Sequence, residues 1–301
     1  MGGFSHRTVL LHEVAEGIDP SAEAVVVDCT LGGGGHAEAL LERLGPTGRL
    51  FGFDRDPDAL AAASARLKRF GDRFVPVRVS FSQMKEKLAE HGVDRIHGLV
   101  ADLGVSSHQL DSATRGFSFR NSGPVDMRMD PEAGVTAAEF IATIGLDELA
   151  ETLGKYGEVR RPYRVARAIL ENQPFADTCE LAAVIASAVG IKPGKTHPAT
   201  RAFQALRIAV NDELGELEAL LDCLPGVLAP GGRAAIISFH SLEDRVVKRR
   251  FFGWAGVGGE KDAYGNLIAA PLARLPRRKA VQSSDDNARA RSARLRIVEW
   301  I

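Results

Sequence analysis

Three aspartates and a run of glycines are the residues in the first part of the chain that are best suited to chemistry. Asp28 closes a run of valines, and four consecutive glycines follow at 32–35. Asp54 ends a second apolar run about 20 residues later, and Asp102 ends another. Glycines let a ligand approach the main chain, and a carboxylate accepts hydrogen bonds from ribose hydroxyls. The pattern predicts a nucleotide-like ligand with Asp54 on its ribose.

These side chains must be positioned by strands that end at one edge of a sheet. Strands are predicted at 25–28, 49–54, 74–79 and 96–102, since apolar and β-branched runs there are separated by helical patterns. In a doubly wound sheet, the carboxyl ends of parallel strands border the crevice that binds the ligand. We therefore expect an α/β fold with a doubly wound, Rossmann-like core.

The spacing within the glycine turn bears on the identity of the ligand. A dinucleotide fingerprint is G-x-G-x-x-G, whereas this turn has the order Asp28-x-Thr30-x-Gly32-x-Gly34. It resembles the D-x-G-x-G-x-G turn of S-adenosylmethionine-dependent methyltransferases, with threonine in the first glycine position. The turn alone leaves a nicotinamide cofactor or a purely structural turn open, and Asp54 favours S-adenosylmethionine.

Aromatic and hydroxyl side chains near the expected crevice have two interpretations each. Phe81 follows the strand predicted at 74–79, where it would contact an adenine or lie in the core. Asp102, Ser106 and Ser107 are candidates for the catalytic site, and the two serines equally suit a turn. A second aromatic pair is left unassigned between base stacking and core packing. This pair is Phe117 and Phe119.

Strand-like sequence stops after Asp111 and resumes only at 233–239. The intervening sequence is helical in character, with capping-box spacings before apolar runs. We expect three segments. They are a first part of the core at 1–111, an inserted all-helical domain for substrate recognition at 112–199 and a second part of the core at 200–301.

Two helices are predicted where the chain returns to the sheet. A single long helix is expected at 200–224, and Ser241 is the expected N-cap of a helix that follows the strand at 233–239.

The whole-chain composition favours a cytoplasmic protein. No apolar run approaches the ~20 residues of a membrane span, and the N-terminus lacks a secretory pattern. The three cysteines are far apart and lack C-x-x-C spacing, so neither a disulfide framework nor a zinc site is expected, and no metal is predicted.

Basic residues are concentrated in three clusters, although the formal net charge is only −1. Solvated helix faces and contacts to nucleic-acid phosphates are both consistent with such clusters. The clusters are Arg160, Arg161, Arg164 and Arg167; Arg245, Lys248, Arg249 and Arg250; and Arg274, Arg277, Arg278, Lys279, Arg289, Arg291, Arg294 and Arg296.

Eight segments, in order along nearly the whole chain, resemble the bacterial small-subunit ribosomal RNA cytosine N4-methyltransferase family, known as RsmH or MraW. Several of them have no general explanation in the fold. They are Asp28 to His36, Phe53 to Pro57, Asp102 to Asp111, Arg115 to Phe119, Asp126 to Asp130, His197 to Arg201, Ile237 to Arg245 and Asn287 to Ser292.

The resemblance implies methyl transfer from S-adenosylmethionine to N4 of a cytidine in the decoding region of 16S ribosomal RNA. It also implies that 16S ribosomal RNA or the small ribosomal subunit is the partner, and it leaves a homodimer open. By position match, the cofactor would be lined by Gly34, Gly35, His36, Asp54, Phe81, Asp102 and Gln109. The assignments of His36 and Gln109 rest on the resemblance alone. The alternatives are a small-molecule methyltransferase and a non-catalytic nucleotide-binding protein of RNA assembly.

Overall fold

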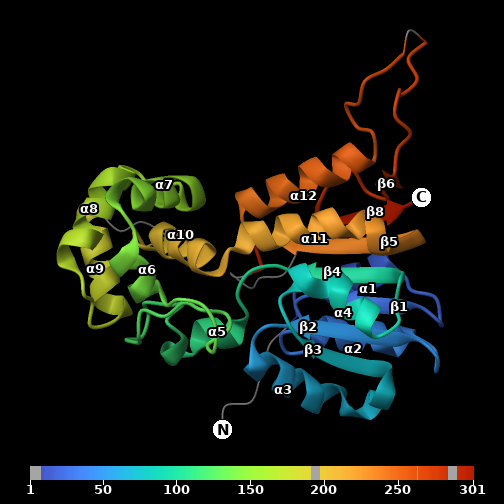
Figure 1. Cartoon of the computed structure of the whole chain (residues 1–301), viewed down its shortest axis with the longest axis horizontal. Coiled ribbons are helices and arrows are strands. Elements are labelled where there is room, and N and C mark those ends of the chain that lie inside the picture. Colours follow the sequence, from blue (N-terminus) through green and yellow to red (C-terminus); the bar gives the residue numbers. More distant parts are fainter. Residues whose placement is uncertain (1–7, 191–196, 263, 284–289) are drawn as a thin grey trace. The chain divides into compact units, whose positions relative to one another are not determined.

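The chain forms two compact units in a computed structural model that describes residues 8–190, 197–262, 264–283 and 290–301 (Figure 1). One unit comprises Met1–Gly104 and Gly215–Ile301, and the other comprises Val105–Leu214. Asn287 and Arg289, which carry part of the last family-like segment, lie outside the described residues. Within the described residues, no helix is both long and apolar enough to cross a bilayer.

The first unit is built on a mixed sheet with the strand order β3-β2-β1-β4-β5-β8-β6, and β7 also pairs with β8. The first five strands are parallel, and β8 runs antiparallel to β5. The strand order reverses at β1, which lies between β2 and β4, so the ligand crevice of such a sheet is expected at the carboxyl ends of β1 and β4. The strands are β1 Val25–Asp28, β2 Arg49–Asp54, β3 Phe74–Arg78, β4 Ile96–Asp102, β5 Leu228–Ser238, β6 Ala273–Arg274, β7 Val281–Gln282 and β8 Arg294–Trp300.

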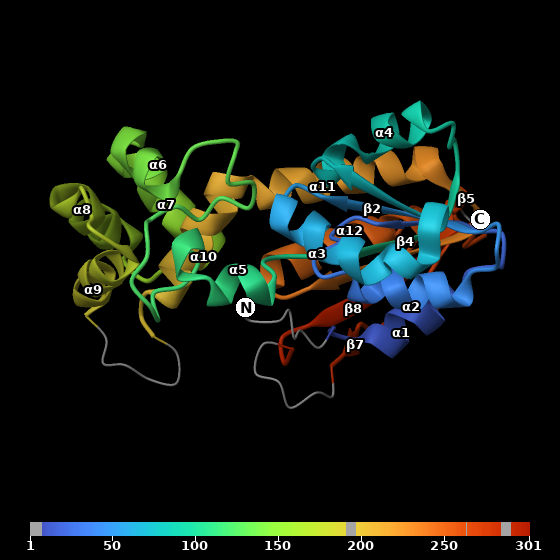
Figure 2. The ribbon, with the colours of Figure 1, turned by 90° about the horizontal axis from the view of Figure 1, so that it is seen from below.

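Helices cover both faces of this sheet, as Figure 2 shows from below. The apolar sides of α1, α2 and α3 share one buried cluster with one face, and those of α4, α11 and α12 share another cluster with the opposite face. Burial on both faces explains why the central strands are almost uniformly apolar. The helices are α1 Leu11–Ile18, α2 Gly35–Arg43, α3 Pro57–Leu67, α4 Met84–Glu90, α11 Glu213–Val227 and α12 Ser241–Trp254.

The second unit consists of helices and irregular loops, with no strand among the residues that are described for it. Its core is one cluster of apolar side chains contributed by α6 to α10 and by the loop that precedes α6. Its helices are α5 Ser107–Asp111, α6 Ala137–Thr143, α7 Leu146–Gly157, α8 Pro162–Asn172, α9 Thr178–Val189 and α10 Thr200–Asn211. The predicted fold class, a doubly wound core with an inserted helical domain, is confirmed.

The single helix predicted at 200–224 is wrong, because Asp212 divides it into α10 and α11. Asp212 has the left-handed backbone angles φ 47° and ψ 42°, and its N–H bonds back to carbonyls of α10. Aspartate tolerates this conformation better than most residues. A side-chain ion pair between Arg207 and Glu213, with Nε and Oε1 2.7 Å apart, bridges the break.

The N-cap predicted at Ser241 is also wrong. His240 is the N-cap of α12, and its imidazole accepts a hydrogen bond from the Glu243 N–H while the Glu243 side chain accepts one from the His240 N–H. This capping box uses a histidine nitrogen where a serine or threonine hydroxyl is usual.

Asn211, at the end of α10, anchors the loop that precedes α6. Its amide nitrogen donates to the carbonyl oxygens of Met127, at 2.7 Å, and Arg207, at 2.9 Å. Its amide oxygen accepts the Met129 N–H at 2.7 Å. Met127 is fully buried with a positive φ of 61°, so these bonds hold a conformation that methionine rarely adopts.

We expect Asn211→Ala to lower the free energy of unfolding by about 2–4 kcal/mol, because it leaves buried backbone groups without partners. Urea denaturation measures the change. Asn172→Ala is the matched control, since this exposed side chain bonds one carbonyl within its own helix. Equal losses in the two variants would contradict the anchoring role.

Candidate active site

The glycine turn between β1 and α2 forms the floor of the expected crevice. Gly32 and Gly34 have positive φ angles of 49° and 75°, and Gly34 is the N-cap of α2. A Cβ at Gly32 would meet only the Thr30 carbonyl oxygen, at 3.8 Å, so this part of the turn is open to a ligand. A Cβ at Gly35 would lie 1.9 Å from Thr8 Oγ1 and 3.1 Å from Thr8 Cβ, so a larger residue there would force Thr8 to shift.

Side chains at the ends of three strands hold this turn. Asp54 accepts the Gly32 N–H with Oδ2 and the Asp56 N–H with Oδ1, both at 2.9 Å. Thr30 Oγ1 accepts the Asp102 N–H at 2.6 Å, and the Thr30 N–H donates to Asp28 at 3.1 Å. The ends of β1, β2 and β4 are therefore connected through the turn.

Asp28, His36 and Asp102 form a cluster of titratable groups at this edge of the sheet. His36 Nε2 lies 3.7 Å from Asp102 Oδ2, which is too long for a hydrogen bond. Among the described residues, Asp28 Oδ2, Asp102 Oδ1 and both imidazole nitrogens have no hydrogen-bond partner although they are buried. Buried polar atoms are normally paired, so the cluster has the capacity to bind a polar ligand. Carboxylates suit a cationic one, such as the ammonium and sulfonium groups of S-adenosylmethionine.

Burial raises the pKa of two of the three strand-end aspartates. The pKa of Asp28 rises to about 7, because desolvation outweighs the influence of His36 and the hydrogen bond from Thr30. Desolvation also raises the pKa of Asp54 to about 6, against the backbone hydrogen bonds from Asp56 and Gly32. Both groups thus titrate close to neutral pH.

The structure divides the predicted site residues between the two units. Gly34, Gly35, His36, Asp54, Phe81 and Asp102 belong to the sheet unit, and Ser106, Ser107 and Gln109 belong to the helical unit. Ser106 is the N-cap of α5, where its hydroxyl accepts the Gln109 N–H and Gln109 Oε1 accepts the Ser106 N–H. Ser107 is the first residue of that helix.

The aromatic candidates have different environments. Phe81 begins a short 3-10 turn after β3 and packs partly buried against the core of the sheet unit. Phe117 is buried in the core of the helical unit. Phe119 packs against Phe203 and His197, with ring centroids 4.8 and 4.7 Å apart, respectively. Phe117 is therefore a core residue of the helical unit, and Phe119 packs partly buried against that core.

Asp28 and Thr30 contribute to the site, although the sequence analysis assigned neither of them a role in binding the cofactor or in catalysis. Asp28 is recognisable in the sequence as the acid that closes β1. Thr30 is recognisable as the departure from glycine in the methyltransferase-like turn. The bond from Asp102 to Thr30 joins residues 72 positions apart, and no local spacing indicates it.

Ion pairs within the sheet unit hold several arginines of the C-terminal basic cluster. Asp244 binds Arg294 and Arg296, at 3.1 and 2.7 Å, and Glu299 binds Arg274 and Arg233. Burial opposes ionisation of Asp244, yet the bonds from Arg296 and Arg294 hold its pKa below the usual value. The pKa of Glu299 is lowered in the same way. These guanidinium groups already have carboxylate partners.

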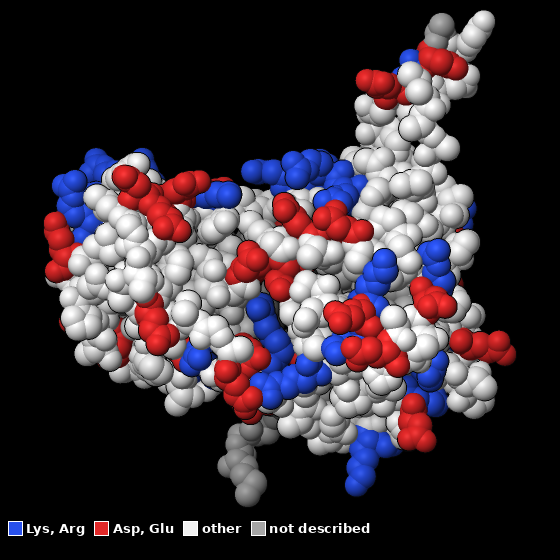
Figure 3. Space-filling view, in the orientation of Figure 1, with Lys and Arg blue, Asp and Glu red and all other residues white. Residues whose placement is uncertain are grey.

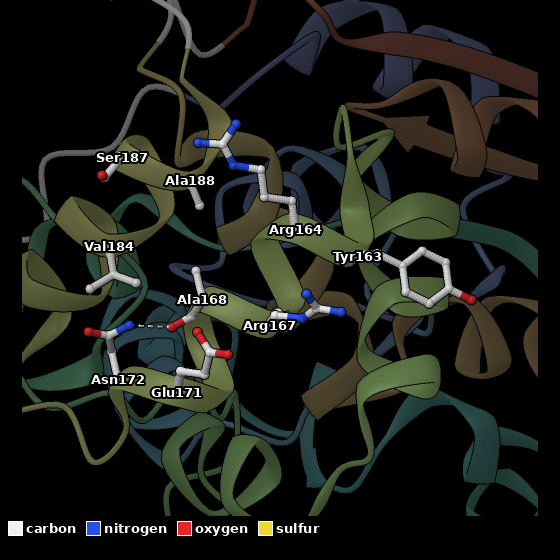
Figure 4. A pocket seen from close by; sticks show the side chains of 9 residues that line it. All are labelled: Tyr163, Arg164, Arg167, Ala168, Glu171, Asn172, Val184, Ser187 and Ala188. Carbon is white, nitrogen blue, oxygen red and sulfur yellow. Dashed lines mark hydrogen bonds between the residues drawn. The ribbon is translucent and has the colours of Figure 1, made fainter.

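Other basic side chains are exposed and gather over α8 of the helical unit and over α12 of the sheet unit (Figure 3). Arg164 and Arg167 line a cavity of about 550 Å³ between α8 and α9. Figure 4 shows Arg164 extending toward Ser187 and Ala188, and Arg167 extending toward the ring of Tyr163. The cavity contains one carboxylate, that of Glu171.

We expect the free energy of unfolding, measured without ligand, to fall as the pH rises from about 4 to about 7, because Asp28 binds its proton more tightly in the folded chain. Asp28→Asn removes this titration, so at about pH 8 it should stabilise the protein by roughly 2–4 kcal/mol and at about pH 4 leave it nearly unchanged. Urea denaturation at both pH values measures the difference. Asp94→Asn, at an exposed position before β4, is the control. A stabilisation independent of pH would contradict a buried charge at Asp28.

Comparison with known proteins shows the family of the chain. The model of the MraW methylase family matches residues 3–301. Three similar proteins are each named Ribosomal RNA small subunit methyltransferase H. The protein from Geobacter sulfurreducens is 47% identical and the alignment covers 98% of this chain and 99% of that one. The protein from Anaeromyxobacter sp. strain K is 48% identical, with 98% of each chain covered, and the one from Synechococcus elongatus is 47% identical, with 99% and 95% covered.

The family expected from the eight sequence segments is thereby confirmed, and with it the enzyme class and the methyl donor. The chain belongs to the MraW methylase family and is a methyltransferase that depends on S-adenosylmethionine.

Proposed function

We propose that the protein methylates the exocyclic N4 of a specific cytidine in the decoding region of 16S ribosomal RNA. The observation that carries this proposal is the match along almost the whole chain to relatives named for methylation of small-subunit ribosomal RNA. The cluster of Asp28, His36 and Asp102, which we call the acceptor cluster, supports the proposal. Transfer to an amine requires groups that accept N–H hydrogen bonds, and this cluster has buried acceptor atoms without hydrogen-bond partners among the described residues.

The residues of the glycine turn and strand ends would hold the cofactor. Asp54, oriented by two backbone N–H groups, has lone pairs left for the ribose hydroxyls. Gly34 opens α2 and gives the ligand access to the helix N-terminus. The carboxylates of Asp28 and Asp102 complement positive charge. We propose that His36 and Phe81 complete the pocket.

S-adenosylmethionine supplies an electrophilic methyl group on a sulfonium. The cytosine amine is a weak nucleophile because its lone pair is delocalised into the ring. With the cofactor supplying the methyl group, the chain's own residues would have to orient the amine and accept hydrogen bonds, and finally one proton, from its N–H groups. Asp102 has a buried oxygen without a hydrogen-bond partner among the described residues, and it is our leading candidate for this acceptor.

Ser106, Ser107 and Gln109 would act from the segment that follows β4. The capping box of Ser106 and Gln109 fixes the start of α5, so their first contribution would be to shape this segment. The hydroxyl of Ser107 is a further candidate acceptor for the amine. Gln109 stays a predicted cofactor residue on the resemblance to the family alone.

The basic surface of the helical unit would contact ribosomal RNA phosphates. Arg164 and Arg167 are exposed and line the α8–α9 cavity, which suits anionic groups. They are better candidates than Arg294 and Arg296, which share the carboxylate of Asp244. We also infer a cytoplasmic location from the ribosomal substrate, and a homodimer stays a prediction.

Incubation with labelled S-adenosylmethionine and small ribosomal subunits that lack base methylation should place the label in N4-methylcytidine, identified by nucleoside mass analysis. Asp102→Ala should lower kcat roughly a hundredfold or more, because the amine loses its acceptor. Asp94→Ala is the control, because Asp94 is exposed and lies before β4, and its kcat should match that of the wild type.

Other results of that experiment would support the alternatives. Label in small molecules but not in RNA would indicate a small-molecule methyltransferase. Tight cofactor binding without any turnover would indicate a non-catalytic nucleotide-binding protein.

Binding to the small ribosomal subunit should weaken steeply with salt, because phosphate contacts release counterions. The double variant Arg164→Ala/Arg167→Ala should reduce the slope of log K against log salt concentration by about 2. Filter binding over a range of KCl concentrations measures the slope. Arg69→Ala, an exposed arginine of the sheet unit paired with Glu38 and Glu42, is the control. Equal slopes in the wild type and the double variant would exclude these two contacts.

A further inference from the structure

The turn that carries Phe81 is held by one carboxylate from a helix far along the chain. Ser80 is the N-cap of this turn, yet its hydroxyl makes no cap hydrogen bond. The hydroxyl donates instead to Glu216 Oε2. Ser82 donates its backbone N–H to the same oxygen at 3.3 Å and its hydroxyl to Oε1 at 3.1 Å. Both neighbours of Phe81 are thus tied to Glu216.

Glu216 is well supported for such a role. It lies near the start of α11, and the next turns of that helix are fixed to the sheet by four fully buried leucines. These leucines are Leu217, Leu220, Leu221 and Leu224. The carboxylate therefore connects a loop at the carboxyl end of β3 with a helix packed on the sheet. A loop with three bonds to a rigid helix has fewer conformations open to it than one without them.

We infer that Glu216 is a positioning residue that sets the location of Phe81 at the cofactor pocket. The inference rests on the proposed function, in which Phe81 lies against the adenine of S-adenosylmethionine. β3 pairs with β2 so that Arg78 is in register with Asp54, the proposed ribose ligand, and Phe81 follows three residues later. An aromatic ring at this edge contributes to cofactor affinity only if its location is fixed in advance, since otherwise binding must order the loop.

The role of Glu216 is distinct from those of the residues in the acceptor cluster. Glu216 bonds Ser80 and Ser82 in the loop, and we assign contact with the transferred methyl group and the amine to other residues. Removing it should therefore weaken cofactor binding and leave the chemical step intact. A residue needed only for folding would instead lower the amount of active enzyme and leave the KM for S-adenosylmethionine unchanged.

The test compares Glu216→Ala, Glu216→Gln, Phe81→Ala and the double variant Glu216→Ala/Phe81→Ala. Calorimetry gives the Kd for S-adenosylmethionine, and steady-state methylation of small ribosomal subunits gives kcat and both KM values. Glu216→Ala should raise the Kd and the KM for S-adenosylmethionine roughly fivefold to tenfold, with kcat and the KM for RNA nearly unchanged. Glu216→Gln should recover part of the affinity, because its carbonyl oxygen still accepts from serine hydroxyls.

The double variant distinguishes action through Phe81 from an independent effect. If Glu216 acts by placing the ring, the double variant should bind the cofactor as Phe81→Ala does, whereas independent residues give multiplied losses. Glu218→Ala removes an exposed glutamate two residues further along α11 and should match the wild type. Ser80→Ala/Ser82→Ala removes the hydroxyl donors instead of the carboxylate, and its Kd for S-adenosylmethionine should rise as that of Glu216→Ala does. This variant keeps the test available if Glu216→Ala folds poorly.

An unchanged Kd in both Glu216→Ala and Ser80→Ala/Ser82→Ala, alongside normal binding by the wild type, would overturn this inference alone. Multiplied losses in the double variant would also overturn it, because Glu216 would then act elsewhere. A wild-type protein that does not bind S-adenosylmethionine would overturn the proposed function as well.

Discussion

The site depends on the interlocking of three parallel strand ends through one glycine turn. The turn leaves β1, its Gly32 N–H is held by Asp54 of β2, and its Thr30 hydroxyl accepts the Asp102 N–H of β4. Glycine at position 30 would have no side chain for the last of these bonds. The threonine that departs from the common methyltransferase turn therefore makes a connection that the common form lacks, and it fixes Asp102 against the turn.

This arrangement keeps carboxylates buried in a place where they are unfavourable without a ligand. Desolvation raises the pKa values of Asp28 and Asp54, so the sheet edge is less stable with both groups ionised. A cationic ligand with hydrogen-bond donors relieves that penalty, because it supplies the partners missing at Asp28 and Asp102. Binding such a ligand would recover, as affinity, the stability that ionisation of these carboxylates costs.

Local patterns in the sequence were sufficient for most of the fold and for part of the site. The strand that ends at Asp102 was predicted with its bounds, and the turn between β1 and α2 was placed correctly. The break at Asp212 was missed because apolar periodicity continues across it, and one residue in a left-handed conformation leaves no pattern. The capping box of Ser106 and Gln109 has the spacing of a known motif, so it was accessible from the sequence. The bonds from Glu216 and Asp102 join residues far apart in the chain, and no spacing rule reaches them.

The arginine clusters show why charge counted along a sequence overestimates a nucleic-acid surface. Arg274, Arg294 and Arg296 contribute to the largest basic cluster in the sequence, yet each of them forms an ion pair with Glu299 or Asp244. These acids meet the arginines through β-sheet register and through the packing of α12. Neither can be read from the composition of the sequence. The cluster that includes Arg164 and Arg167 is smaller, but these two side chains are exposed and share their cavity with one acid only, Glu171. Exposed charge at a concave surface attracts phosphates more strongly than charge held in ion pairs, and on that ground we propose Arg164 and Arg167, rather than Arg294 and Arg296, as phosphate contacts.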